Sequence, residues 1–328
     1  MVESFDRSSM PSGELKPLVF FVGPTATGKS SLGLQWAMEH QSIILNGDSL
    51  QVYREVNIGT AKPTQQERDR VPHRLFDFVL PPEEFTAGKY SQMARAEIKK
   101  EEDVSSYVLV GGSGFYIQAF EKGMYSSPEV AENIKVQISN YISAYGENEL
   151  FVWLRQLDSE YSQKISSNDV YRVKRAIEMI LSTGLSMSQI QQKFEQQKES
   201  LCLKNPICKV GLFGEKPWLK ERVSFRVDQM LERGLVEEAE TLLKRGLKDW
   251  WPMKSVGYLE VVSFLEGHIK STEELKELIV RNTMYLAKRQ RTWFKRDSQI
   301  QWFDASQPQN HLYDRVKEYI QKSINVSV

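Results

Sequence analysis

One eight-residue segment near the start of the chain limits the possible folds more than any other feature. Residues 23–30 read Gly-Pro-Thr-Ala-Thr-Gly-Lys-Ser, which fits the pattern G-x-x-x-x-G-K-[ST]. The bulky apolar run Leu18 to Val22 precedes it and is typical of a buried strand, whereas Ser30 to Gln41 has the composition of a helix. A glycine-rich turn between a strand and a helix lets successive backbone N–H groups converge on an anion. The segment therefore predicts a phosphate-binding loop.

Individual residues of this loop have distinct expected roles. Lys29 adds a point charge, and the hydroxyl of Ser30 is a ligand for Mg²⁺. The residues expected at the phosphates are Gly23, Pro24, Thr25, Ala26, Thr27, Gly28, Lys29 and Ser30. The alternative, a chance glycine-rich turn, leaves the flanking strand and helix unexplained.

The rest of the chain continues the alternation of strands and helices. Ser42 to Asn46, Tyr107 to Val110 and Lys209 to Phe213 are apolar runs of strand length, and Gln92 to Glu102 is polar enough for a surface helix. This order predicts an α/β fold of the P-loop NTPase-like kind, in which helices flank a parallel sheet.

Between the last two of these strands the pattern becomes helical. Val130 to Tyr145 and Asp169 to Ser182 are expected helices, with Asn168 or Asp169 as the N-cap of the second. We therefore expect an all-helical insertion at residues 124–205. The core is expected at residues 17–123 and 206–328, with basic helices toward its end, and residues 1–16 are expected to form a flexible tail.

Composition excludes several other classes of protein. The 328 residues carry 43 Lys and Arg against 43 Asp and Glu, so a nucleic-acid surface must be a local concentration of cations. The apolar run Leu18 to Val22 is far shorter than the about 20 residues of a membrane-spanning helix, and no membrane association is expected. Two cysteines and four histidines have no spacing typical of a zinc site or a disulfide framework. A reducing, cytoplasmic environment is expected.

Asp48 is the first candidate for a reacting carboxylate. The strand Tyr107 to Val110 ends in Gly-Gly-Ser-Gly instead of the Asp that many P-loop ATPases use for magnesium, which weakens a hydrolase interpretation. Asp48 follows another strand, at the sheet edge where open α/β folds bind ligands. A carboxylate there can accept a proton from a group held near the phosphates. The alternative is a structural role in a turn or helix cap.

Cations are concentrated in one late segment of the chain. No acid occurs between Arg281 and Arg296, and the segment contains Arg281, Lys288, Arg289, Arg291, Lys295 and Arg296. On a helix, Ile279, Leu286 and Trp293 lie opposite Arg281, Lys288 and Lys295. The pattern favours contacts with an RNA backbone over an ordinary solvated face.

Several linked motifs resemble those of the bacterial tRNA dimethylallyltransferases, and they occur in the same order over roughly residues 17–305. Besides the phosphate loop, they are Asp48-Ser49-Leu50-Gln51-Val52-Tyr53, Ile58-Gly59-Thr60-Ala61-Lys62-Pro63, Pro72-His73-Arg74, Val110-Gly111-Gly112-Ser113-Gly114-Phe115-Tyr116, Asn168 to Ala176, Val256-Gly257-Tyr258 and Lys288 to Lys295.

The resemblance implies transfer of a dimethylallyl group. The donor is dimethylallyl diphosphate, and the acceptor is N6 of the adenosine immediately 3′ of the anticodon (position 37) in tRNAs that read codons beginning with U. The products are N6-isopentenyladenosine and diphosphate, with Mg²⁺ as the implied cofactor. Asp48 is then the base, and Ser113 stands where the family usually has Thr.

The resemblance also implies which residues touch each partner. Lys216, where the family commonly has Arg, is implied for diphosphate. The residues implied for the tRNA anticodon stem-loop are Asp48, Ser49, Leu50, Gln51, Ser113, Tyr171, Arg172, Val173, Lys174, Arg175, Lys254, Ser255, Val256, Gly257, Tyr258, Leu259, Lys288, Arg289, Gln290, Arg291, Thr292, Trp293, Phe294 and Lys295. Gly47 and Leu259 depart from the usual family residues: relatives often carry a bulkier residue at the first position and a cation at the second.

Three other functions stay open at the level of the sequence. An adenylate isopentenyltransferase shares such a core but does not need the basic helix or the large insertion. A small-molecule P-loop kinase would place ATP in the loop and use Asp48 as its base. A non-catalytic RNA-binding protein would keep its whole activity without Asp48. For the transferase that the resemblance implies, a monomer is expected.

Overall fold

The computed structural model describes residues 15–100, 103–125 and 128–325. Most of the expected tail at residues 1–16 thus lies outside the described residues. The chain divides into two compact units: Met1–Phe120 with Lys204–Val328, called here the core unit, and Glu121–Leu203, called here the inserted unit.

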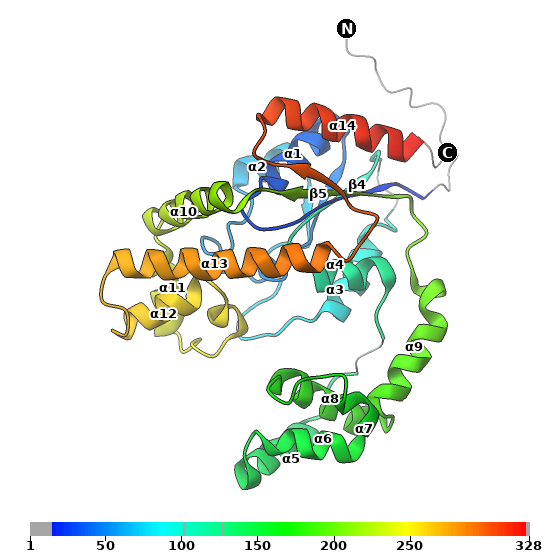
Figure 1. Ribbon diagram of the computed structural model, residues 1–328, viewed down its shortest axis with the longest axis vertical. Helices are drawn as coiled ribbons and strands as arrows, with labels where there is room; N and C mark the ends of the chain where they lie inside the picture. Colours follow the sequence, from blue (N-terminus) through cyan, green and yellow to red (C-terminus); the bar gives the residue numbers. More distant parts are fainter. Residues whose placement is uncertain (1–14, 101–102, 126–127, 326–328) are drawn as a thin grey trace. The chain divides into compact units, whose positions relative to one another are not determined.

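A six-stranded parallel sheet forms the centre of the core unit (Figure 1). Its strand order is β3-β2-β4-β1-β5-β6. The strands are β1 (Leu18–Val22), β2 (Ile43–Asn46), β3 (His73–Arg74), β4 (Tyr107–Val110), β5 (Ile207–Phe213) and β6 (Gln301–Asp304). Strand β1 pairs with both β4 and β5, so its carboxyl end lies between the loops that follow β4 and β5.

Helices cover both faces of this sheet. The core unit contains α1 (Lys29–Glu39), α2 (Gln65–Arg70), α3 (Ala87–Glu97), α4 (Gly114–Lys122), α10 (Lys216–Glu232), α11 (Leu235–Lys244), the short 3₁₀ helix η2 (Trp251–Lys254), α12 (Tyr258–Leu265), α13 (Thr272–Phe294) and α14 (Gln309–Asn325), with α4 continuing two residues into the inserted unit. Helices α1 and α14 pack on one face through residues such as Trp36 and Val316. On the other face, Phe20 of β1 stacks on Phe120 of α4 at 6.0 Å between ring centroids.

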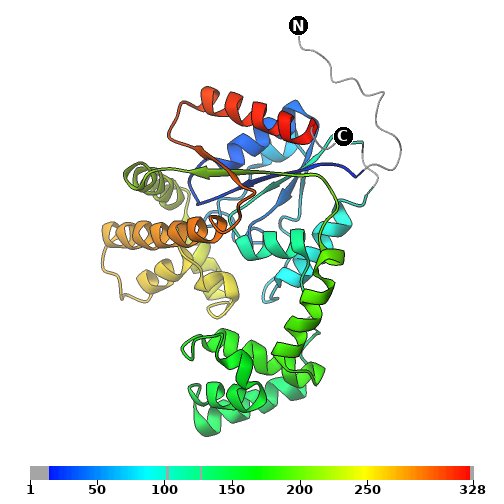
Figure 2. The same cartoon turned by 45° about the vertical axis from the view of Figure 1, so that its right-hand side comes forward.

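A second apolar cluster joins helices α10 to α13, which lie together in both views (Figures 1 and 2). Val223 of α10, Val261 of α12 and Ile279 of α13 are fully or almost fully buried in it. The same cluster includes Val52 and Tyr53, which follow the loop after β2. This packing fixes α13 relative to the loops at the sheet edge.

The inserted unit is entirely helical where it is described. It contains α5 (Glu132–Tyr145), α6 (Glu149–Leu157), α7 (Ser159–Ser162), α8 (Val170–Thr183) and α9 (Met187–Leu201). It has its own core, in which Ile138, Leu154 and Ile177 are fully buried. Asp169 caps α8 by accepting a hydrogen bond from the Arg172 N–H, as the sequence predicts.

The main features expected of the fold are confirmed, with one shifted helix. The chain returns to the sheet at β5 after the inserted unit, and the sheet is parallel throughout. The helix expected at Gln92 to Glu102 instead spans Ala87–Glu97, because Thr86 caps it by accepting a hydrogen bond from the Lys89 N–H. Strands β3 and β6 are additions that the sequence did not indicate.

Candidate active site and nucleic-acid groove

The phosphate-binding loop connects β1 to α1 as expected. Gly28, at the N-cap of α1, has φ +87°, a left-handed conformation that glycine adopts without steric cost. Within the described part of the chain, the backbone N–H groups of Ala26 to Ser30 have no protein acceptor. Several neighbouring donors at a helix N-terminus form a site for an anion.

Lys29 is buried at the base of this loop. Its ammonium group donates a hydrogen bond to the carbonyl of Pro24, which also accepts one from the Thr27 hydroxyl at 2.8 Å. Burial, together with the positive charge of Arg226, lowers the pKa of Lys29 to about 7, against the opposing effect of Asp48. A phosphate in the loop would remove this electrostatic penalty.

Asp48 lies at the carboxyl end of β2, the strand beyond β4 in the sheet. One carboxylate oxygen accepts a hydrogen bond from the Leu50 N–H at 2.8 Å, and the Asp48 N–H donates to the Asn46 side chain at 2.8 Å. These bonds fix the turn that presents the carboxylate. Asp48 is close enough to Lys29 and Arg226 to interact electrostatically with both.

Ser113 connects the Asp48 turn to the loop after β4. Its hydroxyl accepts a hydrogen bond from the Ser49 N–H at 2.8 Å, and its own N–H donates to the Gly47 carbonyl at 3.1 Å. The two turns approach so closely that a Cβ on Gly111 would lie 2.0 Å from the Gly47 carbonyl oxygen. Gly47 stands where relatives often carry a bulkier residue, and it suits the close contact between the two turns. A Cβ at Gly47 would lie 3.1 Å from the Val110 carbonyl oxygen.

Arg226 is a functional candidate that the sequence analysis missed. It lies within α10, and burial lowers its pKa while Asp48 raises it. Lys216, which we expected at the diphosphate, is exposed at the first position of the same helix, about 15 Å along its axis from Arg226. The structure thus brings Arg226 into the electrostatic environment of Lys29 and Asp48, while the diphosphate contact expected of Lys216 stays a prediction. The contribution of Arg226 depends on how α10 packs beside the phosphate loop, which the sequence near Arg226 does not indicate.

Gln290 contacts the phosphate loop directly. The side-chain carbonyl of Gln290 accepts a hydrogen bond from the Thr25 N–H at 2.8 Å, and its amide donates to the Gly112 carbonyl at 3.1 Å. The resemblance of the sequence implies that Gln290 contacts RNA. Its side chain is engaged by two loops of the core unit, and the RNA contact stays a prediction.

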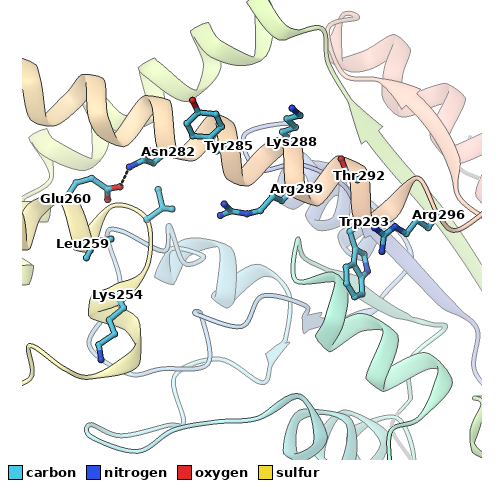
Figure 3. A pocket seen from close by; sticks show the side chains of 11 residues that line it. Lys254, Leu259, Glu260, Asn282, Tyr285, Lys288, Arg289, Thr292, Trp293 and Arg296 are labelled. Atoms are coloured by element: carbon cyan, nitrogen blue, oxygen red, sulfur yellow. Dashed lines mark hydrogen bonds between the residues drawn. The ribbon is translucent and has the colours of Figure 1, made fainter. Parts of the chain in front are cut away.

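Cationic side chains from α13 and the η2–α12 segment line one groove of about 590 Å³ (Figure 3). We call it the basic groove. It is lined by Lys254, Val256, Leu259, Glu260, Asn282, Tyr285, Lys288, Arg289, Thr292, Trp293 and Arg296. Glu260 is the acidic residue among those that line the groove. Its carboxylate accepts hydrogen bonds from the Gly257 N–H and the Asn282 amide, both at 2.6 Å. The groove brings together seven of the residues expected to bind RNA, from two distant stretches of sequence.

Four other residues expected to bind RNA lie in the interior. Val173, Tyr258 and Phe294 have side chains that are 1%, 0% and 4% exposed, and Gly257 is also buried. These residues pack in the interior of the described structure, and the RNA contact expected of them stays a prediction. Tyr258 donates a hydrogen bond to Glu238, which also accepts from the backbone N–H groups of residues 57–59.

In the inserted unit, α8 presents a further exposed group. Tyr171, Arg172 and Lys174 are exposed, whereas Arg175 is half-buried and pairs with Glu178 at 2.8 Å. Arg172 forms an exposed pair with Asp169 at 3.2 Å, which contributes little to stability. Such a pair leaves the guanidinium accessible to a polyanion.

A magnesium ion would take its protein ligand from the phosphate loop. The described residues contain no group of three or more His, Cys, Asp or Glu side chains that could hold a metal. Mg²⁺ typically binds through one or two protein oxygens together with substrate phosphates and water. Ser30, exposed at the start of α1, provides a suitable hydroxyl.

None of the described helices has both the length and the apolar character required to cross a lipid bilayer.

The fold and the site define a P-loop α/β protein that presents a carboxylate and a basic groove beside an anion cradle. A family model described as IPP transferase matches residues 51–297, and the chain belongs to this family. The tRNA dimethylallyltransferase of Bdellovibrio bacteriovorus is 44% identical over 290 residues, which cover 88% of this chain and 93% of the relative. That of Gloeothece citriformis is 39% identical over 312 residues, 95% of this chain and 98% of the relative.

A solved structure supports the same grouping. The crystal structure of the full-length tRNA isopentenylpyrophosphate transferase from Bacillus halodurans superposes with a TM-score of 0.69 at 30% identity. The match covers 95% of this chain and 97% of the other.

Proposed function

We propose that this protein transfers the dimethylallyl group of dimethylallyl diphosphate to N6 of the adenosine at position 37, next to the anticodon, in tRNAs that read codons beginning with U. The names of its relatives support tRNA as the substrate and dimethylallyl transfer as the reaction. The observation that carries the proposal is the position of Asp48 beside Lys29 and Arg226, at the edge of a phosphate loop with unpartnered amides.

The chemistry breaks one bond and forms one. The bond between the dimethylallyl carbon and the diphosphate oxygen breaks, and both electrons leave with the diphosphate. The amides of the loop, Lys29 and Arg226 stabilise the negative charge that develops there. The N6 nitrogen forms the new bond to carbon, and its proton passes to the carboxylate of Asp48.

A magnesium ion bound with the substrate would neutralise further diphosphate charge. Ser30 is its protein ligand in this proposal. The Ser113 hydroxyl, which holds the Ser49 N–H, keeps the Asp48 turn in place and is available to the RNA.

The basic groove anchors the RNA. An adenosine in an anticodon loop is stacked, and extruding it costs about a few kcal/mol. Lys254, Lys288 and Arg289 line one groove and can bind the phosphates of the stem-loop, which supplies this energy. The exposed residues of α8, Arg172 and Lys174, provide further phosphate contacts within the inserted unit.

Mass spectrometry of RNA tests this proposal. An unmodified anticodon stem-loop is incubated with the protein, Mg²⁺ and dimethylallyl diphosphate, and we expect a mass increase of one dimethylallyl group on the adenosine next to the anticodon. Parallel reactions contain AMP as acceptor, or ATP with a hydroxyl acceptor. Prenylated AMP without prenylated RNA, or ADP formation, would favour the adenylate transferase or the kinase, which the relatives do not favour.

The proposal includes the oligomeric state and the cellular location. The protein acts as a monomer in the cytoplasm, where its tRNA substrate is found.

A further inference from the structure

One side chain connects the basic groove to the phosphate loop. Gln290 belongs to α13, and its amide group bridges the Thr25 N–H and the Gly112 carbonyl. Because an N–H faces its oxygen and a carbonyl faces its nitrogen, the two partners fix the orientation of the amide. The Gln290 side chain thus links the loop after β1 to the loop after β4 through two hydrogen bonds.

The same two turns of α13 line the basic groove. Lys288, Arg289, Thr292 and Trp293 are groove residues on either side of Gln290. Trp293 packs so closely on the start of α4 that a Cβ on Gly114 would lie 2.1 Å from its indole ring. Any restraint of this part of α13 by a bound polyanion therefore also restrains Gln290.

Thr25 is a suitable point at which to hold the loop. It immediately precedes the five residues, Ala26 to Ser30, whose N–H groups have no protein acceptor in the described structure. Their convergence on a phosphate depends on the backbone geometry of the loop. Gln290 binds the N–H just before this set, so it braces the cradle without occupying it.

We propose that Gln290 is a positioning residue that couples the two substrates: it fixes the phosphate loop from the helix that lines the RNA groove, so that RNA and diphosphate each strengthen the binding of the other. Linkage requires this strengthening to be reciprocal. The inference rests on the proposed function for the identity of the polyanion in the groove.

The test is a binding cycle with inorganic diphosphate and Mg²⁺. The Kd of diphosphate is measured with and without a saturating, unmodified anticodon stem-loop, for the natural protein and for Gln290→Met, which keeps the side-chain length but removes both hydrogen bonds. Gln229→Met, at an exposed position of α10, is the matched control.

A second variant displaces Gln290 without replacing it. A Cβ on Gly112 would lie 2.3 Å from the Gln290 side-chain nitrogen, so Gly112→Ala pushes the end of this flexible side chain away. Agreement between Gly112→Ala and Gln290→Met would exclude an effect peculiar to the methionine side chain. Thermal unfolding of each variant identifies any loss of folded protein.

We expect RNA to tighten diphosphate binding about fivefold or more in the natural protein and in Gln229→Met. In Gln290→Met and Gly112→Ala this factor falls to about twofold or less, and diphosphate binding without RNA weakens about fivefold, as the loss of one hydrogen bond to the loop implies. The KM for dimethylallyl diphosphate rises by a similar factor, whereas kcat changes less.

An unchanged coupling factor in the folded Gln290→Met protein would overturn the inference, as would the absence of coupling in the natural protein. These outcomes are separate from failure of the proposed function. If the natural protein prenylates no RNA, the proposed function fails, whatever the diphosphate measurements give. If it prenylates RNA while the coupling factor is insensitive to Gln290, only this inference fails.

Discussion

Lys29, Arg226 and Asp48 place one acid near two buried or partly buried cations, at the mouth of a loop with unpartnered amides. The cations disfavour each other in the free protein. A diphosphate reverses this situation, because its negative charge stabilises both. The site is therefore arranged to gain interaction energy when a phosphate group, or a diphosphate leaving group, carries its full charge.

Asp48→Asn tests the role of the carboxylate at the reacting nitrogen. The amide has nearly the same shape but accepts a proton poorly, so we expect kcat for prenyl transfer to fall by about 10²-fold to 10⁴-fold. The Kd of the stem-loop should change less than about twofold. Rapid-quench turnover and filter binding provide the two numbers. A similar loss in binding and in turnover would mean that Asp48 anchors RNA instead.

Lys29 gives the site a specific pH dependence. Its pKa of about 7 means that the free protein carries this charge at pH 6 and has largely lost it at pH 8. Because bound diphosphate favours the charged form, binding at pH 8 should take up to about one more proton than binding at pH 6. Titration calorimetry in buffers of different ionisation enthalpy measures this difference.

Lys29→Arg is the control for this measurement, because arginine stays charged throughout the range. The additional proton uptake at pH 8 should disappear in this variant. Equal uptake by both proteins would show that another group, or the diphosphate itself, accounts for the proton.

At this scale the sequence predicted the residues that belong to a local motif. Lys29 and Asp48 each lie directly after a recognisable strand. Arg226 was missed because it lies inside a helix, about 180 residues further along the chain, and its role depends on the packing of α10. Gln290 is implied as an RNA contact by the resemblance of its segment to the family, whereas its contacts with the two loops depend on the packing of α13 and have no local sequence signal.

Helix α13 combines two functions along its length. Its first half is buried against α10 and α12 through residues such as Leu275 and Ile279. Its second half exposes Lys288 and Arg289 and carries Gln290, and the exposed Lys295 caps its carboxyl end. The apolar side predicted for this helix accounts for its position, since Ile279 is 1% exposed while Arg281 and Lys288 are exposed.

Lys288→Ala tests the basic groove at the level of this element. Loss of one phosphate contact should weaken stem-loop binding and reduce the slope of log K against log salt by about 1. Lys322→Ala, an exposed lysine on α14 outside the groove, is the control and should leave the slope unchanged. Fluorescence anisotropy at several salt concentrations provides the slopes. Equal effects of the two variants would contradict an anchoring role for the groove.

The molecule as a whole is an α/β unit with a helical unit inserted between α4 and β5. The strands and the helical insertion were predictable because strand-length apolar runs alternate with helical periodicity. Two of the six strands could not be predicted from the sequence. Strand β3 has only two residues, and β6 begins at an exposed Gln301, so neither presents an apolar run of its own.

The ends of the inserted unit lie together, which allows a test at this scale. The Leu203 N–H donates a hydrogen bond to the Glu121 carbonyl at 2.8 Å, so a short Gly-Ser linker can replace residues 124–201. We expect this shortened protein to bind diphosphate within about twofold of the full chain, because the phosphate loop lies in the core unit. Stem-loop binding should weaken about tenfold or more, as the cations of α8 are lost.

Circular dichroism and thermal unfolding would establish that the shortened protein folds. Stem-loop binding equal to that of the full chain would contradict a role for the inserted unit in RNA recognition.

A crystal structure with both substrates bound would show how the reacting groups are placed. The Asp48→Asn protein is crystallised with the anticodon stem-loop, Mg²⁺ and dimethylallyl diphosphate. We expect an extruded adenine whose N6 lies within hydrogen-bonding distance of residue 48, with the diphosphate bound by the amides of residues 26–30, Lys29 and Arg226. An adenine that stays stacked in the RNA, or a diphosphate bound away from this loop, would contradict this expectation.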